Sequence, residues 1–169
     1  WWTGDLTAER AMGAHKLAFG LNANRYETAQ RTFSTANWRS ATAPAFSAAT
    51  YGKTSLWGVW IEDALTLGGG VTLTGGIRYD RWRAYGGGLA GRSGGQRVDA
   101  RYPARTDSSV SPKLSLQAGL PGEVEMQLSF GTATRFPTVG ELFQGRFDDI
   151  AQAIDPQSFD PDLRAEKSK

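Results

Sequence analysis

The stretch SLWGVWIEDALTLGGGVTLTGGIRYDRW, residues 55–82, decides the fold class of this protein. Apolar residues alternate with polar or small ones along 55–67 and again along 71–82, and a period of two is typical of a β-strand with two different faces. Three glycines at 68–70 separate the two segments. Such a short glycine-rich connection indicates a hairpin, so we expect two paired antiparallel strands here.

The same alternation continues on both sides of this hairpin. It recurs in residues 15–26, 111–120 and 124–137, which gives five full strands, with fragments of further strands at the two ends of the chain. The clearest case is the segment from 71 to 80. One face carries Val71, Leu73, Ile77 and Tyr79, and the other carries Thr72, Thr74, Arg78 and Asp80. The sequence therefore predicts an all-β protein.

The connections between the predicted strands alternate in length. Residues 68–70 and 120–123 are short turns, whereas 28–50, 85–110 and 138–162 are polar stretches of roughly 25 residues each. Short turns that alternate with long loops, on strands with one apolar face, are typical of a transmembrane β-barrel. The connection 3–14 is longer than the other short turns and fits less well. We predict an antiparallel up-and-down transmembrane β-barrel segment with long extracellular loops.

The composition excludes several classes of function. The formal net charge is +2 and no run of lysine or arginine forms a basic stripe, so nucleic acid is not an expected partner. The absence of cysteine and the single histidine exclude disulfides, thiolate sites and multi-histidine metal sites. No nucleophile–base set is visible, so we expect no enzyme activity, no catalytic residue and no cofactor. Calcium is disfavoured because the EF-hand spacing is missing from Asp148, Asp149, Asp155, Asp160 and Asp162.

The number of strands is too small for a closed membrane barrel, of which the smallest has about eight strands. An open sheet edge in lipid would leave backbone groups without hydrogen-bond partners. We therefore expect residues 1–169 to be a partial β-barrel domain, with barrel closure absent from this chain.

Several motifs resemble the C-terminal half of the barrel of TonB-dependent outer-membrane receptors. Residues 55–82 end in a Gly-x-Arg-Tyr-Asp box at 76–80, and SVSPKLSL at 109–116 is similar to the Ser-Pro-Lys/Arg strand of that family. TRFPTVGELF at 134–143 and DPDLRAEKS at 160–168 resemble its Arg-x-Pro…Glu-Leu-Phe and Asn-Pro-Asp-Leu-Lys-Pro-Glu boxes. Asp160 stands where asparagine is usual, and Arg164-Ala165 where Lys-Pro is usual. The resemblance covers about residues 50–169.

This resemblance implies a barrel of about 22 strands with a plugged lumen in the outer membrane of a Gram-negative bacterium. It implies active uptake of a ferric siderophore, or of another scarce ligand such as haem, cobalamin or a sugar. Energy would come from the TonB complex through a plug domain, which is absent from this chain. Outer-membrane lipid and lipopolysaccharide would surround the barrel. A passive porin-like barrel and a soluble β-sandwich binding module remain alternatives.

Two groups of residues are candidates for functional contacts. The connection 85–110 mixes aromatic and basic side chains that suit an anionic chelate; these are Tyr85, Arg92, Arg97, Arg101, Tyr102 and Arg105. The alternatives for the arginines are a solvated loop or contacts with lipopolysaccharide phosphate. The second group is charged, faces the predicted lumen, and would pair internally or with a plug; it consists of Glu62, Arg78, Asp80 and Arg135.

Overall fold

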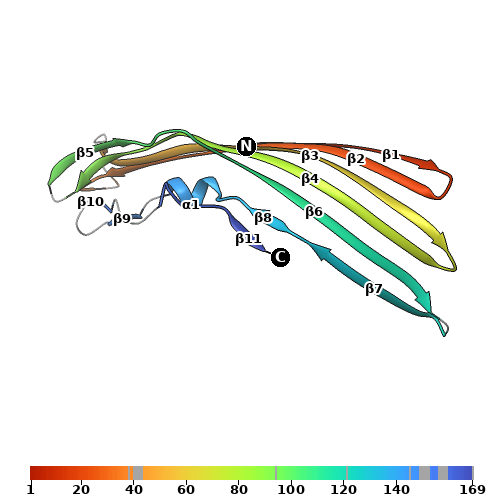
Figure 1. Cartoon of the computed structure of the whole chain (residues 1–169). Helices are drawn as coiled ribbons and strands as arrows, with labels where there is room; N and C mark the ends of the chain where they lie inside the picture. Colours follow the sequence, from red (N-terminus) through yellow and green to blue (C-terminus); the bar gives the residue numbers. More distant parts are fainter. Residues whose placement is uncertain are drawn as a thin grey trace.

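The structure is a computed structural model that describes residues 1–37, 39, 44–93, 95–120, 122–144, 146–148, 153–155 and 160–168. One antiparallel sheet contains most of these residues (Figure 1). Its order is β1 (Trp2–Met12), β2 (His15–Ser34), β3 (Ala45–Gly68), β4 (Val71–Ser93), β6 (Arg105–Leu120) and β7 (Val124–Gly131). Strand β5 (Gln96–Arg101) pairs with the far end of β4. Apart from β5, neighbours in the sheet follow one another in sequence, so the predicted up-and-down all-β fold is confirmed.

The first connection differs from the prediction. Residues 3–14 are not a long turn, because β1 pairs with β2 along its whole length and only Gly13 and Ala14 form the turn. Gly13 adopts a φ of +61°, a conformation that glycine reaches without steric cost. Residues 2–9 alternate between apolar or small side chains and polar ones, and Arg10 then interrupts the apolar side of the strand. Backbone pairing with β2 holds the strand in place over its whole length.

Two of the three predicted long loops are largely paired strands. Strands β2 and β3 continue to Ser34 and back from Ala45, and β4 and β5 form a hairpin that ends at Ser93 and Gln96. The alternation stops in these extensions because polar and small residues occupy both faces, while the hydrogen-bonded ladder continues. Residues 38, 40–43 and 94 of these two connections lie outside the described residues.

The third predicted loop folds back on the sheet. It begins after β8 (Ala133–Arg135), contains helix α1 (Val139–Phe143) and a pair of short strands, β9 (Arg146–Asp148) and β10 (Ala153–Asp155), and ends at β11 (Glu166–Ser168). Strand β11 pairs antiparallel with β8, which closes the base of this connection. Residues 145, 149–152 and 156–159 lie outside the described part.

The register of the sheet separates two faces. Leu21, Val59, Tyr79 and Val110 lie side by side on β2, β3, β4 and β6, and Leu73 lies between Leu65 and Leu116. This side is called the apolar face. Large hydrophobic residues remain exposed across it, among them Leu6, Phe19, Ile61, Ile77, Leu128 and Phe130. Large exposed hydrophobic residues that spread over several neighbouring strands indicate contact with lipid or another apolar partner.

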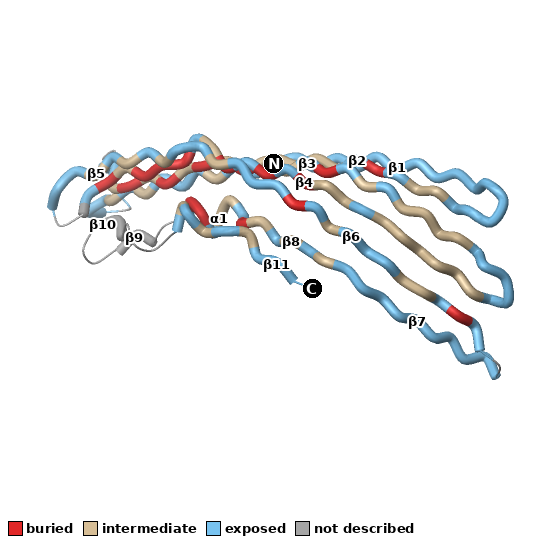
Figure 2. The backbone as a smooth tube through the Cα atoms, in the orientation of Figure 1, coloured by how far each residue is buried: buried red, intermediate tan, exposed pale blue. Residues whose placement is uncertain are grey.

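The opposite side is called the polar face, and most of the buried residues lie there, many of them at the end of the sheet where α1 packs (Figure 2). One cluster joins Trp82 and Ala84 of β4 to Leu142 and Phe143 of α1. A second cluster joins Ala48 and Leu89 beneath the β4–β5 hairpin. In the described ranges, no helix has the length and apolar character needed to cross a membrane.

Candidate functional site

The candidate site lies where the connection between β8 and β11 covers the polar face. We call its residues 136–144 and 160–165 the docked segment. Its helix α1 begins at the N-cap Thr138, whose hydroxyl accepts a hydrogen bond from the Glu141 backbone N–H at 3.3 Å. The Glu141 carboxylate in turn accepts one from the Thr138 N–H at 2.8 Å. This reciprocal capping box satisfies backbone donors that a helix of this length leaves free.

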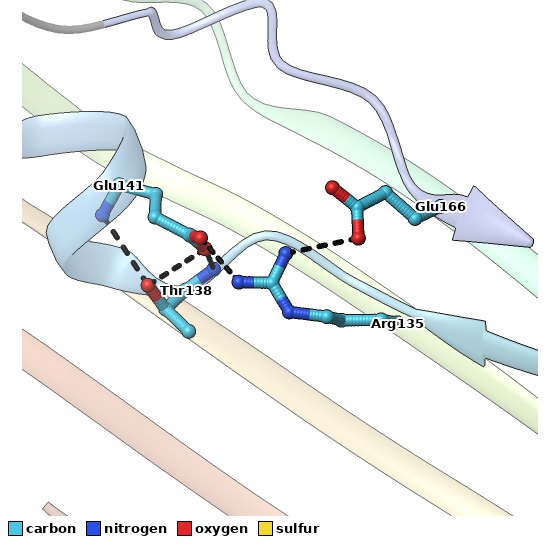
Figure 3. A network of polar contacts seen from close by, with 4 residues as sticks. All are labelled: Arg135, Thr138, Glu141 and Glu166. Atoms are coloured by element: carbon cyan, nitrogen blue, oxygen red, sulfur yellow. Dashed lines mark hydrogen bonds and ion pairs between the residues drawn. The ribbon is translucent and has the colours of Figure 1, made fainter.

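Arg135 links this helix to both strands at the base of the connection (Figure 3). Its guanidinium donates to the Glu141 carboxylate, and its Nη1 lies 3.4 Å from Glu166 Oε2 of β11. The backbone hydrogen bond from Thr138, followed by the Arg135 contact, lowers the pKa of Glu141 to about 2. The network therefore contains an ionised carboxylate at neutral pH. Sequence reasoning placed Arg135 toward a lumen, and here it joins β8, α1 and β11.

Phe143 anchors the helix on the sheet. A Cβ added to Gly52 of β3 or to Gly87 of β4 would lie 2.1 Å from an atom of the Phe143 ring. The two glycines thus form a slot that admits the ring directly against the backbone. Tyr102 stacks on Phe143 with ring centroids 6.3 Å apart. This contact buries part of the tyrosine, and the burial raises the pKa of its phenol.

Arg105 anchors the other end of the docked segment. Its guanidinium donates to the carbonyl oxygens of Pro161 and Leu163, the latter at 3.0 Å. It also lies 5.9 Å from the centroid of the Trp82 ring, which is stacked on Phe136. Two residues predicted as ligand contacts, Tyr102 and Arg105, therefore hold the docked segment in place.

The other four predicted ligand residues occupy two different places. Arg92 and Arg97 are exposed and lie opposite each other near the tip of the β4–β5 hairpin, and Arg101 is exposed at its base. Tyr85 lies on the side of the apolar face, with the Arg83 guanidinium 5.1 Å from its ring centroid. The six residues are not brought together, because Tyr102 and Arg105 lie on the polar face and the other four lie on the side of the apolar face.

A second polar cluster lies deeper on the polar face. The Arg78 guanidinium donates to both carboxylate oxygens of Asp80, at 2.6–2.9 Å, and to the side-chain oxygen of Asn22 at 2.5 Å. Asp80 is only 6% exposed. A Cβ on Gly58 would lie 2.2 Å from an Asp80 oxygen, so this glycine makes room for the cluster. The sequence identified Arg78 and Asp80 but missed Asn22, although its inward position in the alternating pattern was a usable signal.

Glu62 forms an ion pair with Lys113 on the neighbouring part of the polar face. Beside this pair is a cavity of about 310 Å³, lined by Trp60, Glu62, Arg78, Ser111, Lys113 and Thr132 among others. Within the described ranges, no group of three or more histidine, aspartate or glutamate side chains is placed to hold a metal ion. Asp149, which belongs to the acidic stretch noted in the sequence, lies outside those ranges. The Glu62–Lys113 ion pair and the cavity beside it offer charged side chains and space to a bound group.

Comparison with known proteins gives one match. A family model described as TonB dependent receptor-like, beta-barrel, matches residues 1–169 of the chain. No match was found among curated proteins or among solved structures. The family match includes the whole sheet and the docked segment.

Proposed function

The chain belongs to the TonB-dependent receptor-like β-barrel family, and from this membership we propose that it is part of a receptor that takes up a ferric siderophore or a similar scarce ligand. The family is one of outer-membrane receptors and transporters, not a class of enzymes. The observation that carries the proposal is the two-faced sheet. Its apolar face suits the lipid, and its polar face, with the docked segment, suits a lumen.

The rest of the barrel belongs to the same proposal. Strands β1 and β7 are the edges of the main sheet in the described structure, and their outer backbone groups need partners in lipid. We propose that further strands pair with them and that a plug domain fills the lumen and contacts the TonB complex. Glu62, Arg78, Asp80 and Arg135 would face that plug. The cavity beside Glu62 and Lys113 supports this, since it offers both charges and space.

The ligand site would lie at the end with the long hairpins, which is extracellular in barrels of this type. The exposed Arg92, Arg97 and Arg101 would attract an anionic ferric chelate through their positive charge. Tyr102 and Arg105 would shape the wall of the site through the docked segment. Tyr85 lies on the same side of the sheet as Arg92, Arg97 and Arg101 but farther from the tip of the hairpin, so it would contribute least.

The experiment is growth of a Gram-negative strain with a ferric siderophore as sole iron source, with the full-length receptor as its only uptake route. We expect the triple variant Arg92→Gln, Arg97→Gln and Arg101→Gln to lower uptake while surface expression stays at the wild-type level. Arg10→Gln, at the opposite end of the sheet, is the matched control and should leave uptake unchanged. Unaltered uptake by the triple variant at normal expression would contradict the proposed ligand site.

A second experiment distinguishes active transport from passive diffusion. Deletion of TonB in the same strain should abolish uptake if the receptor is energised through its plug. Uptake that persists without TonB would favour the porin-like alternative. The soluble sandwich is already disfavoured, since large apolar side chains such as Phe130 and Leu6 are about two-thirds exposed.

A further inference from the structure

Two charged residues interrupt the apolar face in one row that crosses the first strands of the sheet. Arg10 of β1 lies opposite Leu17 of β2, and Leu17 lies opposite Asp63 of β3. We call these three residues the charged row. On its far side, Asp63 lies opposite Gly75 of β4. A cation and an anion thus stand one strand to either side of a leucine, on a surface that otherwise suits lipid.

The charged row lies inside the part of the sheet that spans the membrane. Asp63 precedes the end of β3 at Gly68 by five residues, about 17 Å along the strand. Its partner Gly75 precedes Tyr79 by four residues, about 14 Å, and only beyond Tyr79 does this side of β4 carry the charged Arg81. Ionisable residues at this level are costly in lipid, and in membrane proteins they pair with a polar partner.

The contacts within the chain leave both charges of the row available. His15 Nδ1 lies 2.7 Å from Asp63 Oδ2, and no described residue donates to Asp63 Oδ1. A carboxylate accepts more hydrogen bonds than one histidine supplies, and the Asp63 side chain is 36% exposed. Arg10 is exposed and forms no ion pair in the described part of the chain. A Cβ on Gly75 would meet only Leu114, at 3.9 Å, so the surface beside Asp63 is open.

The charged row is complementary to itself. The Cα atoms of Arg10 and Asp63 are about 10 Å apart, because two strand spacings separate them. In a two-fold dimer, residue i of one copy contacts residue j of the other, and the reverse. A two-fold axis along the membrane normal beside Leu17 therefore brings Arg10 of each copy to Asp63 of the other. The long arginine side chain spans the difference in height that the strand tilt introduces.

We propose that a second copy of the receptor binds to this face within the membrane, with an Arg10–Asp63 ion pair on either side of the two Leu17 side chains. Lipid tails are as apolar as the sheet, so polar contacts and close packing, not the hydrophobic effect, hold membrane proteins together. A cavity of about 510 Å³ opens on the same face, lined by Leu6, Phe19, Leu21, Ile61, Ile77 and Val110 among others. It gives side chains of the second copy room to pack. The proposal rests on the outer-membrane location of the family and is independent of the transported ligand.

The test is crosslinking of the full-length receptor in native outer membranes, in a version without other cysteines. Leu17→Cys should give a dimer with a short thiol-specific crosslinker, because the axis places the two thiols close together and facing sheets are about 10 Å apart. The matched control is Leu128→Cys, which is half exposed on the same face but lies on β7, away from the axis. This control should stay monomeric.

Charge reversal identifies the ion pairs. Arg10→Glu alone and Asp63→Arg alone each place like charges opposite one another, so the yield of crosslinked Leu17→Cys dimer should fall about tenfold. Co-expression of the two variants, carrying different affinity tags, sets opposite charges together at both contacts. It should restore the crosslink between unlike copies. A second copy would not rescue a residue whose role is confined to its own barrel.

A milder set of variants covers the case in which Asp63→Arg fails to fold. Arg10→Gln and Asp63→Asn should each lower the crosslinked yield, and the double variant should lower it no further, because all three remove the same contacts. Monomeric Leu17→Cys at wild-type expression, equal crosslinking of Leu128→Cys, or an unchanged yield in folded Arg10→Glu would overturn the proposal. The last result is expected if Arg10 meets only lipid phosphate. Because the readout is a contact between copies, a failure of the siderophore proposal would leave these results unaffected.

Discussion

At the scale of single residues, the polar face depends on charges that are satisfied inside the sheet. Asp80 is buried, and Arg78 and Asn22 provide the contacts that an isolated carboxylate would lack. Gly58 keeps the space for these side chains, because any side chain there would overlap them. A buried carboxylate is costly without its partners, so the residues of this cluster depend strongly on one another.

Replacement of Arg78 by glutamine should destabilise the full-length barrel by about 2–3 kcal/mol, because it leaves the Asp80 carboxylate without its charged donor. The matched control is Lys16→Gln, which breaks an exposed ion pair with Glu9 at 2.9 Å and should cost less than about 1 kcal/mol. Urea titrations of the receptor folded in lipid vesicles measure both. Equal losses in the two variants would show that the Asp80 cluster is no stronger than a surface pair.

At the scale of elements, the docked segment is stable only because the sheet holds it. A helix as short as α1 does not persist alone in water. The capping box, the Phe143 slot and the Arg105 contacts each attach it at a different point. The loss of any one attachment should therefore loosen the segment without unfolding the barrel strands.

Acid should release the capping end of this segment. The folded pKa of Glu141 is about 2, below its ordinary value of 4.5, so its contribution is fully present above pH 4.5 and disappears as the pH falls toward 2. The chain has no cysteine, so a spin label at Gln144→Cys reports on α1 alone. We expect label mobility to rise across this pH window. The Glu141→Gln variant should be mobile at every pH, and a pH-independent signal in the parent would contradict the assignment.

A methyl group at Gly87 should displace Phe143. Gly87→Ala places its Cβ 2.1 Å from a ring atom, so the ring must leave the slot, at a cost of about 1–3 kcal/mol of docking free energy. The control is Gly4→Ala, where nothing lies within 4 Å of the new atom. Limited proteolysis of the connection between β8 and β11 in the native receptor measures docking. Equal protease resistance in the two variants would mean that the slot does not hold the segment.

At the scale of the whole molecule, no second layer covers the apolar face of the sheet in the described part of the chain. Phe19, Ile61 and Ile77 stay about half exposed there, whereas Trp82 and Leu142 are buried on the other side. In water such a surface would drive association, and in lipid it is the favourable state. The exposed apolar side chains and the docked segment therefore lie on opposite sides of the sheet.

Adjacent positions on β4 should respond differently to charge. Leu73 lies between Leu65 and Leu116 on the apolar face, so Leu73→Arg should cost about 2–4 kcal/mol if it sits near the membrane midplane. Thr74 lies between Ala64 and Ser115 on the polar face, where an arginine can reach water, so Thr74→Arg should cost less. Folding titrations of the full-length receptor into lipid vesicles decide. Equal effects would argue that neither face meets lipid.

The local sequence pattern is enough to predict the central parts of β2, β3, β4, β6 and β7, the side that each residue faces, and the family of the protein. The alternation in residues 55–82 placed Leu73 and Thr74 on opposite faces, because strand geometry is local and its period is fixed by the backbone. The motifs around Arg78 and Glu141 pointed to the family that the comparison identified. These features could be predicted since each depends on neighbours in the chain.

The course of the connections follows instead from contacts between segments that are far apart in the chain. Tyr102 and Arg105 were predicted to contact a ligand, yet they hold residues some 40 to 60 positions away, Phe143 and Leu163 among them. The slot formed by Gly52 and Gly87 exists only once β3 and β4 are paired and a helix crosses them. The extensions of β2, β3 and β4 carry little alternation, so pairing with a neighbour, not side-chain pattern, places them. Contacts between distant segments leave no periodic signal, because their spacing in the chain is set by the fold and not by backbone geometry.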